Sequence, residues 1–195
     1  MTDFIKTIAA AAALAISATA LAQTSPYAGE QQRSIKALDA RDVAALRQGQ
    51  GMGFAKAAEL NGYPGPMHTL ELAEPLQLSP EQRSATRRLM DEHRARARNL
   101  GEAIVQAEAA LDRLFAERQA TPERVGEATQ RVASLQALLR AEHLNTHLAQ
   151  TALMSPAQTL RYAELRGYSG AAPAAGIGNE SGLQPGQPPV HQHRH

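Results

Sequence analysis

The chain has 195 residues, of which 20 are Lys or Arg, 19 are Asp or Glu and none is Cys. A formal net charge of +1 provides no bulk electrostatic field that would recruit nucleic acid. Without cysteine the chain forms no disulfide, so its stability in an oxidising compartment has to come from packing alone.

The first 22 residues have the pattern of an export signal. Lys6 lies in a short polar start, residues 8–20 are apolar and rich in alanine, and Ala20-Leu21-Ala22 offers a small-x-small cleavage site. A membrane anchor is the alternative, but a bilayer span needs about 20 strongly apolar residues, and this run is shorter. We therefore expect export to the periplasm and removal of residues 1–22 as a cleavable signal peptide.

Short elements are expected between the signal and the middle of the chain. Residues 23–38 show no convincing periodicity, which predicts a flexible arm. Asp39, with a second aspartate three residues later, marks a helix start. Three glycines follow at a spacing that is not that of a phosphate-binding loop, so we expect a weak or bent helix that ends at Asn61-Gly62. Residues 68–72 are predicted to form a further short helix.

Two long amphipathic helices are predicted next. Apolar residues recur at steps of three or four from Pro80 to about Gln119, and Thr121-Pro122 starts a second helix of the same kind. A link of about two residues forces an antiparallel hairpin. Such a rod, roughly 60 Å long at 1.5 Å per residue, is too thin to bury its own apolar stripe. We therefore expect a second subunit or a bound client to cover the remainder.

The C-terminal part is predicted to hold one more helix and a tail. The helix runs from Pro156 to about Arg166, and residues 169–195, rich in glycine, proline, alanine and glutamine, predict a disordered tail. The chain shows no alternating β-branched pattern typical of strands. The expected fold class is all-α, a long antiparallel hairpin with flanking shorter helices, in a helical domain over residues 39–168.

A short motif occurs twice, 76 positions apart: Leu78-Ser79-Pro80-Glu81-Gln82 and Met154-Ser155-Pro156-Ala157-Gln158. Each serine can accept a hydrogen bond from the third helical N–H while the glutamine reaches back to the serine's N–H. Proline at the first helical position loses only an N–H that had no partner. The two copies resemble the Leu-Thr-x-x-Gln repeat of the Spy/CpxP family, periplasmic helical proteins that include ATP-independent chaperones, zinc-resistance-associated proteins and CnrX-type heavy-metal sensors. Serine replaces threonine twice, and methionine replaces the second leucine.

The resemblance implies a thin, curved homodimer with a concave face. The leading hypothesis is therefore a periplasmic ATP-independent chaperone, an envelope-stress protein that binds unfolded proteins on an amphipathic helical surface. Apolar side chains would contact the client, and arginines would supply steering and solubility. The alternative for the arginine cluster is a solvated helix face with spaced ion pairs. The residues assigned to the client-binding surface are Arg87, Arg94, Leu100 and Ile104.

The competing hypothesis is a periplasmic heavy-metal sensor or metal-resistance protein that reports to a membrane-bound sensor component. His143 and His147 lie four apart on one helix face, close enough for both imidazoles to reach one divalent ion such as zinc, copper, nickel or cobalt. In CnrX-type sensors the resemblance implies a site of histidine, glutamate and methionine that includes a His-x3-Met pair, whose methionine is here replaced by histidine. The segment 51–66 is also similar to the one before the first repeat in metal-sensor-like members. Candidates to complete the site are Glu142, Met154, His93 and His68.

Two groups of histidines have simpler explanations. His93 falls on the apolar stripe, which favours a buried histidine bonded to a carboxylate or backbone partner over a ligand. His191, His193 and His195 lie in the predicted tail, where ordering a coil around an ion costs about 1–2 kcal/mol per residue. The serines of the motif are explained as caps, and no nucleophile with a partnered base is evident. We therefore expect no enzyme activity and no required cofactor.

Overall fold

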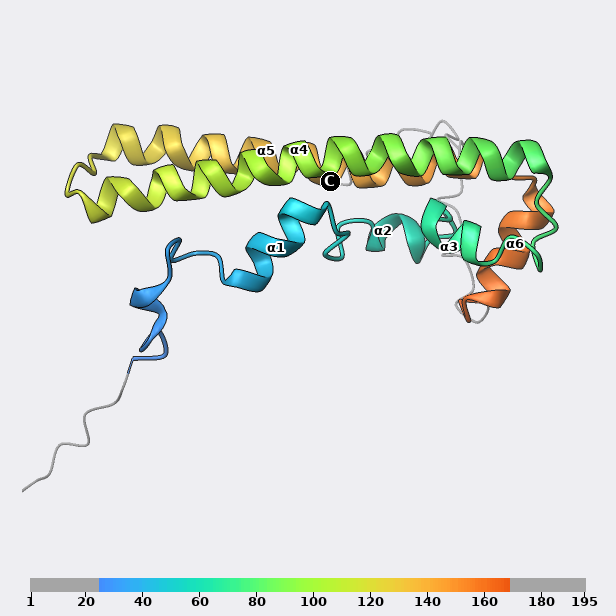
Figure 1. Cartoon of the computed structure of the whole chain (residues 1–195), viewed down its shortest axis with the longest axis horizontal. Coiled ribbons are helices and arrows are strands. Elements are labelled where there is room, and N and C mark those ends of the chain that lie inside the picture. The colour runs from blue at the N-terminus through green and yellow to red at the C-terminus, as the bar shows by residue number, and fades with distance from the viewer. Residues whose placement is uncertain (1–24, 169–195) are drawn as a thin grey trace, which may run out of the picture.

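The computed structural model describes residues 25–168, and these contain six α-helices, a 3-10 turn at Glu30–Gln32 and no β-strand. The all-α class and the long hairpin with shorter flanking helices are confirmed (Figure 1). The predicted signal peptide, 1–22, and the predicted tail, 169–195, lie outside the described residues. The helices are α1 (Ala40–Gln48), α2 (Lys56–Glu59), α3 (Pro66–Glu71), α4 (Pro80–Ala116), α5 (Pro122–Ala152) and α6 (Pro156–Leu165).

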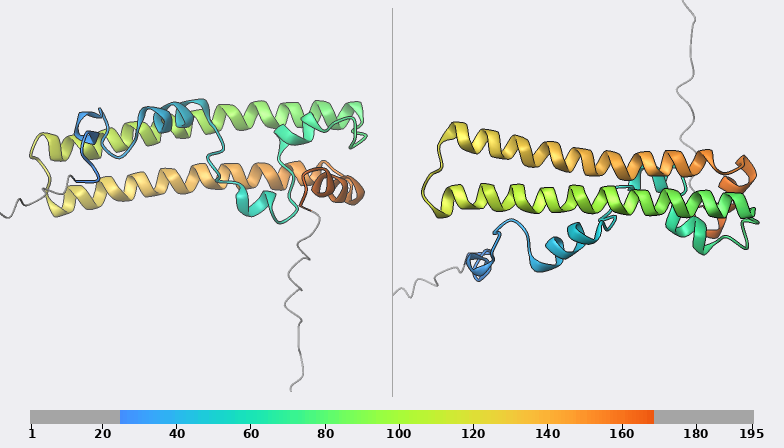
Figure 2. Two further views of the ribbon diagram at one scale, coloured as in Figure 1. Left: turned by 90° about the horizontal axis from the view of Figure 1, so that it is seen from below. Right: turned by 45° about the horizontal axis from the view of Figure 1, so that its top comes forward.

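The antiparallel pair α4 and α5 forms the long axis of the molecule (Figures 1 and 2). The link between them spans residues 117–121 and is longer than the sequence predicted, because α4 ends three residues before Gln119. Arg118 adopts a left-handed backbone with φ of 54°, which a continuing helix cannot accommodate. Thr121 then starts α5, and its side chain accepts a hydrogen bond from the N–H of Arg124.

The segment that precedes the hairpin lies along one side of it (Figure 1). Helix α1 packs on α4, α2 packs on α5, and α3 contacts both. Gly101 allows the approach of α1, since a Cβ atom at this position would overlap the carbonyl oxygen of Leu46. The N-terminal segment therefore covers part of the apolar stripe that the sequence assigned to a second subunit or a client. The buried cluster at this junction consists of Ile35, Leu46, Ala97, Ile104, Val105 and Leu139.

Part of the predicted flexible arm is packed against the hairpin, which corrects that prediction. Ile35 is only 7% exposed, and both the backbone N–H and the Nζ of Lys36 donate to the Asp112 carboxylate, at 3.1 and 3.3 Å. A single apolar anchor produces no periodicity, so the pattern-based reading missed it. Asp39 starts α1 with a capping box, as predicted, and α1 ends at Gly49 instead of continuing as a bent helix.

Two residues assigned to the client-binding surface belong to the core instead. Ile104 is 1% exposed, and Leu100 packs against the same buried cluster. Arg87 and Arg94 are exposed. Periodicity identified the apolar stripe correctly but did not show that α1 would cover it.

Both copies of the repeated motif cap their helices as predicted. Ser79 and Gln82 form a capping box at the start of α4, and Ser155 and Gln158 form one at the start of α6. The apolar residues that precede the two serines meet in a second buried cluster, which brings the start of α6 against the start of α4. The buried members of this cluster are Ala73, Leu76, Leu78, Met154 and Tyr162. Over residues 25–168, no helix combines the length and apolar character that a bilayer span requires.

Candidate functional site

A cavity of about 880 Å³ lies between the N-terminal segment and the hairpin. Its walls come from the loop after α1, from α2 and α3, from the middle of α4 and from the last third of α5, with Arg166 at the end of α6. Every histidine of the described residues lines it: His68 from α3, His93 from α4, and His143 and His147 from α5. The fold thus brings together four side chains that span 79 positions of sequence, from 68 to 147.

His93 and His143 form the buried end of this group. Their rings pack edge to face with centroids 4.6 Å apart, and they are 7% and 5% exposed. Burial lowers the pKa of His93, and burial together with the neighbouring His93 lowers the pKa of His143 to about 4. Both imidazoles are therefore neutral at neutral pH, and each keeps a ring nitrogen lone pair.

Three of the four rings are oriented by a hydrogen bond from Nδ1 to an oxygen. His147 Nδ1 donates to the carbonyl oxygen of Tyr63 at 2.8 Å, His68 Nδ1 lies 2.7 Å from Glu71 Oε2, and His93 Nδ1 lies 3.2 Å from Glu142 Oε1. When such a ring binds a metal through Nε2, a bond of this kind holds the remaining proton on Nδ1. Metal-binding histidines are held in this way, with the second nitrogen donating to a carboxylate or a carbonyl.

His143 has no such partner. Its Nε2 is buried and makes no hydrogen bond in the described residues. A buried polar nitrogen without a partner is costly, and in native proteins an ordered water or a bound ion commonly satisfies such an atom. The four imidazoles, with the neutral rings of His93 and His143 and this unpartnered nitrogen among them, form a donor set that fits a bound transition-metal ion.

Glu59 on α2 brings a carboxylate to the same cavity, although the sequence analysis did not single it out. Its Oε2 lies 3.7 Å from His147 Nδ1. Its Oε1 accepts from Tyr162 at 2.6 Å, from Tyr168 at 3.1 Å and from Arg166 Nε at 3.3 Å. Burial and the Glu59 carboxylate raise the pKa of Tyr162. Through this network the cavity is connected to α6.

Two of the predicted ligands lie away from the cavity. Glu142 Oε1 is held by Arg96 Nε at 2.9 Å and by His93, so its carboxylate orients His93 from behind. His93 is thus buried and bonded to a carboxylate, as expected from its place on the apolar stripe, and its side chain also lines the cavity. Met154 is 9% exposed in the second buried cluster, where its sulfur accepts from Thr69 Oγ1 at 3.9 Å. Within residues 25–168, no three His, Asp or Glu side chains already converge as an ion would require.

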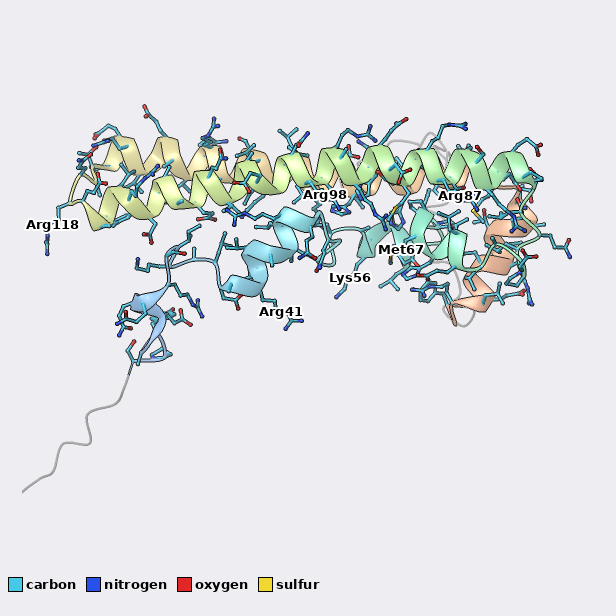
Figure 3. All side chains as sticks on the ribbon, in the orientation of Figure 1. Arg41, Lys56, Met67, Arg87, Arg98 and Arg118 are labelled. Carbon is cyan, nitrogen blue, oxygen red and sulfur yellow. The ribbon has the colours of Figure 1, made fainter. Side chains whose placement is uncertain are left out.

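The cavity also holds sulfur atoms that the sequence analysis did not assign. Met52, Met67 and Met90 line it. Two sequence signals could have identified them: Met67 directly precedes His68, and Met90 lies three residues before His93, on the same face of α4. Figure 3 shows Met67 beneath α4, between the positions of Arg98 and Arg87 along that helix.

Comparison with known proteins supports a metal-related role for this arrangement. A family model described as heavy-metal resistance matches residues 43–161, more than half of the chain and a range that includes all four cavity histidines. No curated protein and no solved structure matches the chain significantly.

Proposed function

Because this chain belongs to the heavy-metal resistance family, we propose that it is a periplasmic sensor or resistance protein that binds a metal ion in the cavity between its N-terminal segment and its hairpin. This family belongs to the Spy/CpxP-like helical proteins, which supports the broad resemblance seen in the repeated motif but does not identify a subfamily. The observation that carries the proposal is the gathering of His68, His93, His143 and His147 around one cavity. The proposal gives the protein no catalytic role.

The ligands come from two parts of the fold. His143 and His147 belong to the hairpin, whereas His68 and Glu59 belong to the short helices that lie along it. Since these groups do not already converge within the described residues, binding would favour an arrangement in which the short helices sit closer to α4 and α5. Any ligand that prefers one arrangement shifts the population toward it. Metal binding would thereby change the surface that a membrane-bound sensor component contacts.

The chaperone hypothesis has less support than the metal hypothesis. Ile104 is buried and Leu100 packs against the core, so half of the assigned client surface is absent. A homodimer stays a prediction, and it now rests on the outer face of α5, where Leu138 and Leu148 are 56% and 52% exposed. Sedimentation of the mature chain at several concentrations tests it, and a monomer at all of them would remove the dimer.

Calorimetric titration tests the proposed function. The chain, with His191, His193 and His195 replaced by alanine, is titrated with Zn(II), Cu(II), Ni(II), Co(II) and the monovalent ions Cu(I) and Ag(I). At least one ion should bind with a dissociation constant below about 10 μM. The H143Q/H147Q variant should lose that binding at least tenfold. If no ion binds, or if the variant binds as tightly as the parent, the cavity is not a metal site.

A further inference from the structure

Sulfur donors are concentrated at the cavity. The described residues contain four methionines, and three of them, Met52, Met67 and Met90, line it, while Met154 lies in the second buried cluster. Because the chain has no cysteine, thioethers are its only sulfur donors. Met67 and Met90 also line an adjoining smaller cavity together, which places both at the boundary between α3 and α4.

The exposed methionines are not explained by packing. Met52 and Met67 are 44% and 45% exposed, so neither contributes a fully buried side chain to a core. Met52 also has a left-handed backbone, with φ of 43°, at a position where glycine or asparagine would be less strained. Strain of this kind is concentrated at functional sites, where the side chain has a role that offsets its cost.

The charges around the cavity disfavour a highly charged cation. Lys56, Arg94, Arg98 and Arg166 line it, and the only carboxylate among its lining residues is Glu59, whose Oε1 is already shared by Arg166 and two tyrosines. Coulomb repulsion scales with the charge of the ion, so a divalent ion meets twice the repulsion that a monovalent ion meets. The carboxylates of Glu71 and Glu142 bond to the rings of His68 and His93 but are not among the residues that line the cavity. The remaining donors in the lining, imidazole and thioether, carry no negative charge.

We propose that this site takes a soft monovalent ion, Cu(I) or Ag(I), and that Met67 and Met90 supply thioether ligands beside the imidazoles. Thioethers select soft ions such as Cu(I), whereas harder divalent ions are better served by carboxylates and waters. The inference rests on the proposed function and narrows it, because it excludes Zn(II), Ni(II) and Co(II) as the preferred ions.

Affinity measurements on matched variants test the inference. Cu(I) affinity is measured under a reductant by competition with a chromophoric chelator, and Ag(I) and Zn(II) affinities by calorimetry, all on the chain without tail histidines. M67L and M90L remove sulfur while keeping an apolar side chain of similar volume. Each should weaken Cu(I) and Ag(I) at least tenfold and leave Zn(II) within twofold. The matched control M154L, outside the cavity, should change none of the three by more than twofold.

A second readout reports the ligands directly. With methionine methyl groups labelled by ¹³C, one equivalent of Ag(I) should shift the methyl signals of Met67 and Met90 and leave that of Met154 in place. If a divalent ion binds at His143 and His147 more tightly than Cu(I) and Ag(I), the soft-ion inference is wrong while the proposed function stands. Unshifted methyl signals of Met67 and Met90 at saturating Ag(I) would also overturn it. If no ion binds at all, both fail.

Discussion

Gln82 and Gln158 hydrogen-bond to each other in both directions, with Gln82 Nε2 donating to Gln158 Oε1 at 2.9 Å and Gln158 Nε2 donating to Gln82 Oε1 at 3.0 Å. Each amide also donates to a backbone carbonyl, that of Leu153 or that of Leu76. The repeated motif therefore does more than cap two helices. It joins the start of α4 to the start of α6, the helix whose C-cap residue Arg166 lines the cavity.

This pairing predicts a coupled loss of stability. Q82A removes the capping-box partner of Ser79, both bonds between the two amides and the bond to the Leu153 carbonyl, while Gln158 keeps its bonds to Leu76 and Ser155. The substitution should lower the free energy of unfolding by about 1–3 kcal/mol. In a double-mutant cycle, Q82A and Q158A should couple by at least about 0.5 kcal/mol, as measured by urea denaturation. The control Q130A removes only an exposed bond to Ser134 and should change stability by less than about 0.5 kcal/mol. Strictly additive effects of the two substitutions would mean that the coupling free energy is zero and that the amide pair does not stabilise the fold.

The contact between α1 and α4 predicts opposite effects for two glycine substitutions. Gly to Ala within a helix ordinarily stabilises by about 1 kcal/mol. G126A, on an open part of α5 where nothing lies within 4 Å, should show that gain. G101A should instead destabilise the protein and detach α1, because the new methyl group overlaps the Leu46 carbonyl. Thermal denaturation and amide exchange of α1 measure both effects, and a stabilised G101A protein would mean that α1 does not pack at this position.

Glu108 predicts a pH-dependent stability. It is 8% exposed in α4, and burial raises the pKa of its carboxyl above the ordinary value of 4.5. The folded state then binds this proton more tightly than the unfolded state, so the contribution is most favourable below pH 4.5 and is lost as the pH rises through the folded pKa. E108Q should therefore stabilise the protein at neutral pH and have little effect in acid.

Glu102 provides the control of opposite sign. Its hydrogen bond from Arg47 lowers its pKa, so its contribution is present at neutral pH and is lost as the pH falls. E102Q should slightly destabilise the protein at neutral pH. Urea denaturation of both variants at neutral and acid pH checks the pair, and equal signs at neutral pH would contradict the assignment of Glu108 as a buried acid.

The export signal expected from the sequence predicts a defined N-terminus for the mature chain. Small residues at 20 and 22 fit the signal-peptidase site, so the periplasmic form should begin at Gln23. Intact-mass spectrometry of the periplasmic fraction measures this directly. A chain that keeps residues 1–22 and sediments with membranes would instead support an anchor.

The elements that could be predicted from the sequence are those with a periodic pattern or a repeated motif. The helical period gave α4 and α5, and the serine–glutamine spacing gave the caps of α4 and α6. The periodic reading could not find Ile35, because one buried residue in an irregular segment has no period. The periodic pattern also left the apolar stripe of the hairpin uncovered within the chain, because the packing of α1 on α4 depends on the close approach at Gly101.

The candidate site was predicted in part for a related reason. The spacing of His143 and His147 places both on one helix face, whereas the approach of His68 and Glu59 is a tertiary event. The sequence likewise did not show which methionines would line the cavity. Met154, the one methionine named as a candidate ligand, packs in the second buried cluster, whereas Met67 and Met90 reach the cavity from other helices.

The most direct test of the account is a ring-nitrogen titration. The mature chain, with its C-terminal histidines intact, is labelled with ¹⁵N in its histidine rings. It is titrated with Ag(I), and in a second arm with Zn(II), while the Nε2 signals are followed by NMR. The account predicts that the Nε2 signals of His143 and His147 shift first and saturate at one equivalent in at least one arm. Shifts confined to His191, His193 and His195 in both arms would contradict it, because the metal would then bind only outside the cavity.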